Sequence, residues 1–301
     1  MTRLRVGTRG SDLALRQTRW VCDLLRDAHA ALEFEELVIK THGDLATGQP
    51  LDTGFPVGGF VSAIEQALLQ GRIDFAVHSY KDLPTAPTPR LMIAAVPVRE
   101  VPHDVLITHD PVTLSNLPRG MRIGTSSPRR AAQLRRLADV QIVPIRGNVP
   151  TRVAKVENGE IDGVVLAAAG LKRLALRPPK LIDLPIDRFM PAPAQGALAV
   201  QVREGDAIAA LLAVIEHRPS RCAVEAERAF LRNLHAGCHT PVGALAMVFD
   251  GTISLHGQLF SDDGVHIVEG VETGDDPHTI GARLAERLAQ ELHGRRSEPR
   301  P

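Results

Sequence analysis

The chain contains two copies of one pattern, and this internal repeat limits the possible fold more than any other feature of the sequence. The segment VGTRGS (Val6–Ser11) is matched by IGTSSP (Ile123–Pro128), in each case an apolar stretch followed by Gly-Thr and small polar residues. The segment GRIDFAVHSYKDL (Gly71–Leu83) is matched by GEIDGVVLAAAGL (Gly159–Leu171), with Gly, Ile, Asp, Val and Leu in register. We therefore predict two lobes of the same design, joined near residues 97–102.

Strand-like and helix-like segments alternate along the repeat. A predicted strand at Leu4–Thr8 precedes an amphipathic helix at Leu13–His29, which Ser11 is placed to cap, and a second strand follows at Glu35–Thr41. Such alternation predicts an α/β fold with a sheet covered on both faces. Because ligands of α/β sheets bind beyond the carboxyl ends of the strands, both Gly-Thr turns are expected to face a cleft between the lobes.

At 301 residues the chain is long enough for more than one domain. The segment PAPAQGALAVQV is predicted to return a strand to the first lobe. A later helix, a loop, three strands and a last helix predict a small α+β C-terminal domain. The predicted divisions are lobe 1 at 1–98 with 196–216, lobe 2 at 102–193, the C-terminal domain at 218–293, and a disordered Arg/Pro-rich tail at 294–301.

Charge and composition argue against several classes of protein. The 35 basic and 35 acidic residues balance, which disfavours a nucleic-acid-binding protein with an extended basic face. No apolar run has the length of a membrane span, no signal-peptide pattern is present, and three cysteines make a poor disulfide framework. We therefore expect a cytoplasmic protein without nucleic-acid or membrane partners. Most of the basic residues are arginines, which fits a GC-rich genome or the bidentate binding of carboxylates and phosphates.

The second Gly-Thr turn carries the residues of an anion site, in the segment GTSSPRRAAQLRR. Cations at a helix N-terminus oppose the helix dipole, so helix stability does not explain arginines there. Free N–H groups, hydroxyls and arginines together bind anions. The candidate residues of this turn are Thr125, Ser127, Arg129 and Arg130. The later arginines of the segment, Arg135 and Arg136, are predicted to face solvent.

Further arginines fall on similar turns. The segment PIRGNVPTR contains Arg146, next to a glycine that allows close backbone approach, and Arg152 one helical turn later. A cleft-facing role and a solvated helix start explain this spacing equally well. Arg9 in the first repeat and Arg173 after the second are two more candidates. No P-loop pattern is present, so a nucleotide P-loop is not supported.

A histidine, a lysine and a carboxylate follow the end of a predicted strand in FAVHSYKDLPT, as His78, Lys81 and Asp82. In the repeat Asp82 falls opposite Gly170, so only the first lobe carries a carboxylate at this turn. Packing does not require these groups, so one interpretation gives Asp82 a functional role. The alternative is an exposed Lys81–Asp82 ion pair, which contributes little to stability.

The three cysteines differ in their surroundings. Cys22 and Cys222 fall within predicted helices and are expected to be core thiols. Cys238 lies in a predicted loop, which favours a nucleophilic or covalently modified thiol. Zinc binding by His235, Cys238 and His239 is the weaker interpretation, because no second cysteine pair has ligand spacing.

Eight motifs, in order along almost the whole chain, resemble those of one family, the porphobilinogen deaminases or hydroxymethylbilane synthases. They are GTRGSDLAL, AVHSYKDLP, GTSSPRRAAQL, RGNVPTR, LAAAGLKRL, PAPAQGALAV, AERAFL and AGCHTPVG. One departure is the segment GFPVGGFV, which lacks the lysine that many members carry there. The resemblance therefore implies nothing about anion binding by residues 42–59.

The resemblance implies two lobes like those of periplasmic binding proteins, flanking a cleft, and a third domain that bears a cysteine. It implies a monomeric transferase, with no metal, that condenses four porphobilinogen molecules head to tail onto a covalent dipyrromethane cofactor. Each condensation releases ammonia, and hydrolysis then releases hydroxymethylbilane. The position matching the thioether-forming cysteine is Cys238, and the position matching the catalytic carboxylate is Asp82. The positions matching residues that hold acetate and propionate groups are Arg9, Ser11, Lys81, Thr125, Ser127, Arg129, Arg130, Arg146, Arg152 and Arg173.

A protein of another class remains an alternative. A non-catalytic two-lobe anion-binding protein, such as a periplasmic receptor or the effector domain of a regulator, would explain the lobes and the arginines. It would not explain a loop cysteine in a third domain. A zinc hydrolase is a more distant possibility.

Overall fold

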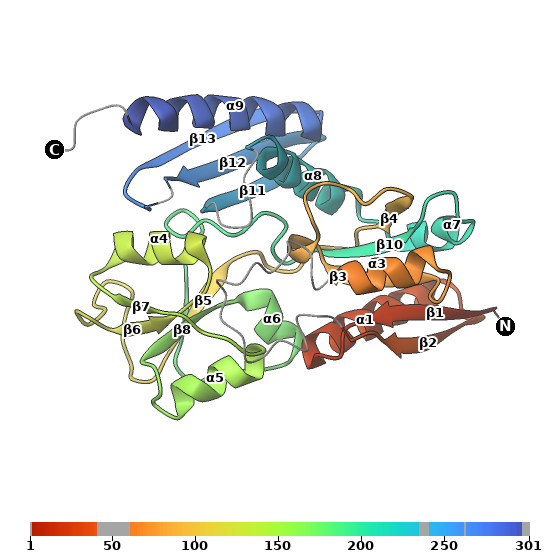
Figure 1. Cartoon of the computed structure of the whole chain (residues 1–301), viewed down its shortest axis with the longest axis horizontal. Helices are drawn as coiled ribbons and strands as arrows, with labels where there is room; N and C mark the ends of the chain where they lie inside the picture. Colours follow the sequence, from red (N-terminus) through yellow and green to blue (C-terminus); the bar gives the residue numbers. More distant parts are fainter. Residues whose placement is uncertain (1, 41–60, 235–240, 262, 297–301) are drawn as a thin grey trace. The chain divides into compact units, whose positions relative to one another are not determined.

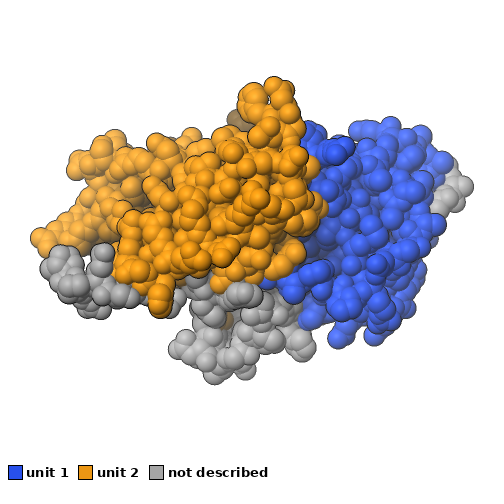
Figure 2. All heavy atoms as spheres, turned by 90° about the horizontal axis from the view of Figure 1, so that it is seen from above, with its two compact units in different colours: residues 1–100, 196–221 blue, residues 101–195, 222–301 orange. Residues whose placement is uncertain are grey.

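The computed structural model describes residues 2–40, 61–234, 241–261 and 263–296, and every statement about the structure refers to these (Figure 1). The chain forms two compact units (Figure 2). Unit 1 comprises Met1–Glu100 and Gly196–Arg221, and unit 2 comprises Val101–Gln195 and Cys222–Pro301. No helix in the described ranges is both long and apolar enough to cross a membrane.

Unit 1 is built on a five-stranded mixed sheet in the order β2-β1-β3-β10-β4. Its strands are β1 (Thr2–Thr8), β2 (Leu32–Val38), β3 (Phe75–Ser79), β4 (Leu91–Ala95) and β10 (Leu198–Arg203). Strand β1 runs parallel to β2 and β3, whereas β10 runs antiparallel to β3 and β4. The late strand β10 thus lies between β3 and β4 in the sheet formed by the N-terminal segment.

Helices cover both faces of this sheet, because alternate residues of β3 point to opposite sides. Phe75 and Val77 share a core with α1, and Ala76 shares another with α3. The Ser11 side chain accepts a hydrogen bond from the backbone N–H of Ala14 at 3.3 Å and caps α1, as the sequence predicts. The helical elements of unit 1 are α1 (Asp12–Ala28), α3 (Ser62–Leu69), η1 (Tyr80–Asp82), α7 (Ile208–Leu212) and η2 (Ala213–Ile215).

Unit 2 contains a second five-stranded sheet, in the order β7-β6-β8-β5-β9. Its strands are β5 (Asp104–Thr108), β6 (Arg122–Gly124), β7 (Gln141–Val143), β8 (Gly163–Ala167) and β9 (Leu181–Asp183). Its helices are α4 (Pro128–Leu137), α5 (Val149–Glu157) and α6 (Ala168–Arg173). The predicted α/β class is confirmed for both lobes, although β5 and β9 are strands that the sequence pattern did not reveal.

The structure confirms the internal repeat down to single contacts. In both sheets one strand pairs in parallel with two neighbours, and two antiparallel pairings then extend the sheet on one side. In the first, Arg5 Nη2 lies 2.7 Å from Asp74 Oδ1; at the repeated positions, Arg122 Nη2 lies 2.7 Å from Asp162 Oδ1. In each copy the aspartate also accepts a hydrogen bond from the backbone N–H of its arginine partner. The two lobes therefore share one design.

A three-stranded antiparallel sheet with two helices completes unit 2. Its elements are α8 (Arg218–Asn233), β11 (Val242–Phe249), β12 (Thr252–Phe260), β13 (Ile267–Gly274) and α9 (Pro277–Arg296). Phe230 of α8 and Leu284 of α9 are fully buried in one core with the inner face of the sheet. Helix α9 continues to Arg296, so the tail predicted to be disordered from residue 294 begins with helix, and residues 297–301 lie outside the described ranges.

Candidate functional site

The turn after β3 presents Asp82 on a fixed piece of backbone. The backbone N–H of Tyr80 donates to the carbonyl of Ala197 at 3.0 Å, and Gln17 of α1 exchanges hydrogen bonds with the Ser79 hydroxyl at 2.9 and 3.2 Å. The Tyr80 side chain is buried, whereas Asp82 is exposed. The surrounding fold therefore holds the turn while leaving the carboxylate open to solvent and ligands.

The repeated turn in unit 2 has no such group. Helix α6 follows β8 directly, as η1 follows β3, and the residue in the position of Asp82 is the buried Gly170. Of these two turns, only the one in unit 1 offers a carboxylate.

His78 belongs to the core rather than to the exposed part of its motif. Its side chain is buried, and burial lowers the pKa of His78 to about 4 in spite of an opposing effect of Gln201. The imidazole is therefore neutral at physiological pH, and Lys81 and Asp82 are the exposed charged groups of this turn.

The turn before α4 is tied to the turn before α5. The Ser126 hydroxyl donates to the carbonyl of Ile145 at 2.8 Å and accepts from the N–H of the same residue at 3.0 Å. Ser127 caps α4 by accepting from the N–H of Arg130 at 3.4 Å, and the Thr125 hydroxyl accepts from the N–H of Ser127 at 3.1 Å. Hydrogen bonds thus join the α4 turn to the α5 turn.

Arg152 lies on the second of these turns. Asn148 caps α5, and Arg152 Nε donates to the carbonyl of Gly147 at 2.8 Å, where a φ of 110° requires glycine. Burial, followed by the charge of Arg130, lowers the pKa of Arg152. None of the ion pairs found within the described ranges involves Arg152, so no carboxylate there balances its charge.

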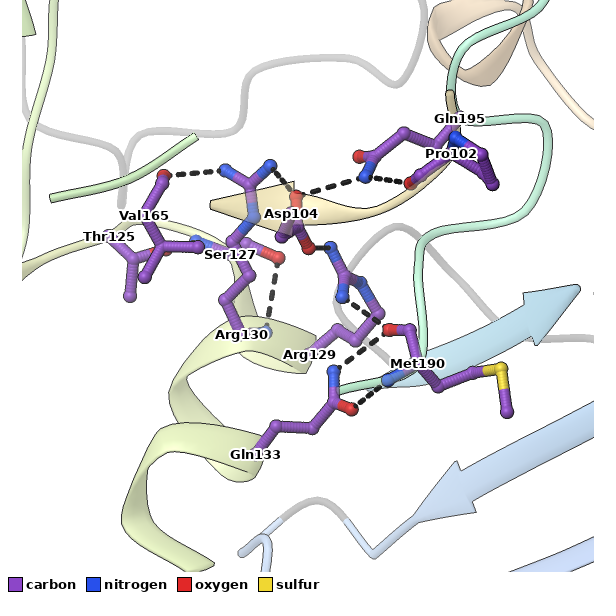
Figure 3. A network of polar contacts seen from close by, with 10 residues as sticks. All are labelled: Pro102, Asp104, Thr125, Ser127, Arg129, Arg130, Gln133, Val165, Met190 and Gln195. Atoms are coloured by element: carbon purple, nitrogen blue, oxygen red, sulfur yellow. Dashed lines mark hydrogen bonds and ion pairs between the residues drawn. The ribbon is translucent and has the colours of Figure 1, made fainter. Parts of the chain in front are cut away.

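Arg129 and Arg130 converge on Asp104, the first residue of β5 (Figure 3). Arg129 Nη2 lies 2.7 Å from one carboxylate oxygen of Asp104, and Arg130 Nη2 lies 2.6 Å from the other. Asp104 is fully buried, which by itself would raise its pKa. The two guanidinium groups outweigh burial and hold the pKa of Asp104 well below its usual range.

The same two arginines differ in their other partners. Arg129 Nη1 donates to the carbonyl of Met190 at 2.5 Å, and its guanidinium lies 5.8 Å from the centre of the Phe189 ring. Arg130 Nη1 donates to the carbonyl of Val165 at 2.9 Å. In the part of the chain that is described, the buried Nε atoms of both arginines have no hydrogen-bond partner.

The remaining predicted site residues are placed as follows. Four are half-buried: Arg9 and Ser11 after β1, Arg146 after β7, and Arg173 at the end of α6. Lys81 is exposed. Cys238, His235, His239 and the whole loop 42–59 lie outside the described ranges. Asp104, by contrast, was missed from the sequence, because a single aspartate ahead of an apolar run resembles a solvated strand end.

Comparison with known proteins identifies the family of the chain. A family model described as "Porphobilinogen deaminase, dipyromethane cofactor binding domain" matches residues 4–210, and one described as "Porphobilinogen deaminase, C-terminal domain" matches residues 222–290. The chain is 46% identical to a porphobilinogen deaminase of Nocardia farcinica, over 97% of this chain and 86% of the relative. It is 47% identical to that of Thermus thermophilus, over 95% of each chain. The chain therefore belongs to the porphobilinogen deaminase family.

Proposed function

We propose that the α4 and α5 turns of unit 2 bind carboxylates of the cofactor and of the growing pyrrole chain, and that Asp82 of unit 1 moves the protons. Family membership makes the chain a transferase, hydroxymethylbilane synthase, which uses porphobilinogen and a dipyrromethane cofactor. The match to an enzyme family along the whole length disfavours the alternative of a non-catalytic anion-binding protein. The roles of individual residues in this reaction are our proposal.

The observation that carries this proposal is an imbalance of charge. Arg129, Arg130 and Arg152 are buried or half-buried and electrostatically coupled, and within the described ranges Asp104 is the one carboxylate that pairs with any of them. Burying a charge without a partner is costly. Each pyrrole unit carries an acetate and a propionate, so a bound chain supplies the missing negative charge. The hydroxyls of the turn suit hydrogen bonds to those carboxylates.

Asp82 suits the proton transfers. A positioned carboxylate can give a proton to the amine that leaves as ammonia. It can then take a proton from the terminal pyrrole ring to which the new unit has been added. When ionised it also stabilises the cationic methylene-pyrrole left by the substrate's loss of ammonia. We propose as further carboxylate contacts Arg9, Ser11, Lys81, Thr125, Ser127, Arg146 and Arg173.

Cys238 is proposed as the attachment residue. The dipyrromethane supplies the pyrrole terminus to which substrate units are added. The other cysteines suit attachment poorly: Cys22 is 1% exposed, and burial raises the pKa of its thiol to about 12, which disfavours the reactive thiolate. Cys222 is half-buried in α8 and packs against the C-terminal core.

The domain division, the oligomeric state and the location of the protein are also proposals. We propose that unit 2 consists of lobe 2 and a separate C-terminal domain, because its two sheets have separate cores. We also propose a monomeric cytoplasmic enzyme without nucleic-acid or membrane partners, in line with the balanced charge of the chain.

Intact mass spectrometry tests the attachment site. We expect purified protein to exceed the mass of its polypeptide by one dipyrromethane, and Cys238→Ser to lack the added mass. Cys222→Ser is the matched control and should keep it. An adduct that a peptide digest places on Cys22 or Cys222 would sink the assignment of Cys238.

A further inference from the structure

An irregular segment, Met190–Gln195, is buried almost throughout, and polar side chains of lobe 2 hold its first residue. The N–H of Met190 donates to Gln133 Oε1 at 2.6 Å (Figure 3). Its carbonyl accepts from Gln133 Nε2 at 3.0 Å and from Arg129 Nη1 at 2.5 Å. Buried loops need such partners because their backbone groups have no strand or helix to satisfy them. Helix α4 therefore fixes the start of this segment, which we call the strut.

The last residue of the strut is fixed by Asp104. Gln195 Nε2 donates to Asp104 Oδ1 at 2.9 Å and to the carbonyl of Pro102 at 2.6 Å. Asp104 thus receives hydrogen bonds from Arg129, Arg130 and Gln195. Both ends of the strut are bonded to the cluster that contains the two arginines.

The middle of the strut is bonded to the C-terminal sheet and to α8. The N–H of Ala244 in β11 donates to the carbonyl of Pro191 at 2.9 Å. The fully buried carboxylate of Glu227 in α8 accepts from the N–H of Ala194 at 2.6 Å and from that of Ala246 at 2.8 Å. Helix α8 and strand β11 are the elements that precede and follow Cys238 in the sequence. The strut therefore connects the arginine cluster to both elements that flank the proposed attachment residue.

We infer that the two adjacent arginines have different roles. Arg129, together with Asp104, is a positioning residue that fixes the strut and thereby α8 and β11. Arg130, whose backbone N–H is bonded to the capping hydroxyl of Ser127 at the α4 turn, contacts the ligand carboxylates. The inference rests on the proposed function, because it divides the proposed anion site between the two side chains.

The pair provides its own control. Replacing either arginine by glutamine leaves one arginine bonded to Asp104, so the remaining ion pair is of the same kind in both variants. What differs is the other partner that is lost: the carbonyl of Met190, and with it the strut, for Arg129, or the carbonyl of Val165 in β8 for Arg130.

We would measure cofactor loading by intact mass, the Tm of cofactor-free protein, and the KM and kcat of the loaded protein. For Arg130→Gln we expect loading to be lost or the KM for porphobilinogen to rise at least about tenfold, the effect of losing a charge-assisted contact. Its cofactor-free Tm should fall less than that of Arg129→Gln, because the bonds that Arg130 makes to Asp104 and Val165 do not hold the strut. For Arg129→Gln we expect a Tm lower by about 4 °C or more, a lower kcat, and a KM within about threefold of the wild type.

A destabilised variant elsewhere separates positioning from loss of stability alone. Leu32→Ala removes a buried side chain of β2 in unit 1 and should lower the Tm without lowering kcat near room temperature. If Arg129→Gln lowers kcat no more than Leu32→Ala does, or if it raises KM as much as Arg130→Gln, the division of roles is wrong. If neither Arg130→Gln nor Arg152→Gln changes loading or KM, the proposed anion site itself is wrong.

Discussion

Asp82 is exposed on a turn whose backbone is held by its neighbours. The turn is bonded to α1 through Ser79 and to the segment before β10 through Tyr80, while the Asp82 side chain makes no part of the core. Removing its charge should therefore leave folding intact. Because the Asp82 side chain does not contribute to the core, a variant of Asp82 can test catalysis without changing stability.

We expect Asp82→Asn to load cofactor, to keep a Tm close to that of the wild type, and to lose at least ~100-fold in turnover, the low end for a positioned acid–base group. Asparagine keeps the size of the side chain but has neither the negative charge nor an acidic proton to transfer. The measurement is the rate of porphobilinogen consumption by protein that intact mass shows to be loaded. More than about a tenth of wild-type activity would return Asp82 to the interpretation of an exposed ion pair, whose loss has little effect.

At the residue scale the sequence identifies side chains with chemistry but not their partners. Cys238, Asp82 and the arginines stand out because helix and strand formation do not explain them. The partner of Arg129 and Arg130 is more than twenty positions away, at the start of a strand, and only the tertiary fold brings Asp104 beneath α4. Without that carboxylate, both arginines are predicted to be ligand contacts of the same kind.

At the scale of elements, helices and strands were predicted correctly where the internal repeat or a capping residue marks them. The helix capped by Ser11, the first strand and the strand after PAPAQGA were all predictable, because apolar periodicity and capping are local. Strands β5 and β9 were not. Strand β9 has three residues, too few for a period to be recognised, and the five residues of β5 are all buried, so β5 has no alternation of buried and exposed positions.

Two glycines of α9 allow a sharp test of how its packing is determined. In an exposed helix, Gly→Ala stabilises by up to about 1 kcal/mol. A Cβ at Gly281 would lie 2.6 Å from the Cβ of Ala229 and 2.7 Å from the backbone N of Phe230 in α8, whereas a Cβ at Gly294 would meet nothing within 4 Å. We expect Gly281→Ala to destabilise by about 1–3 kcal/mol, the usual cost of overpacking, and Gly294→Ala to stabilise slightly. Urea denaturation measures both, and equal effects would mean that α8 and α9 do not approach so closely.

For the whole molecule the central fact is that a chain of zero net charge concentrates positive charge beside the α4 turn. The sequence reveals the arginines and the balance of the totals, but not their burial, which depends on the assembled sheet and on Asp104. A buried excess of positive charge makes the folded protein dependent on its ligand: the cofactor should act as a structural counter-charge as well as a primer. The dependence is measurable without any assay of turnover.

We expect cofactor-loaded protein to melt at least a few degrees above cofactor-free protein purified from a host that cannot make porphobilinogen. A charge-assisted hydrogen bond contributes about 1.5–3 kcal/mol, and anything that binds only the folded state raises its stability. Arg152→Gln removes a half-buried charge that no described carboxylate balances, so the cofactor-free variant should be no less stable than the wild type. Its gain on loading should shrink, or loading should fail. Arg135→Gln, at an exposed position of α4, is the matched control and should keep the full gain. An unchanged gain in Arg152→Gln would show that this arginine does not contact the cofactor.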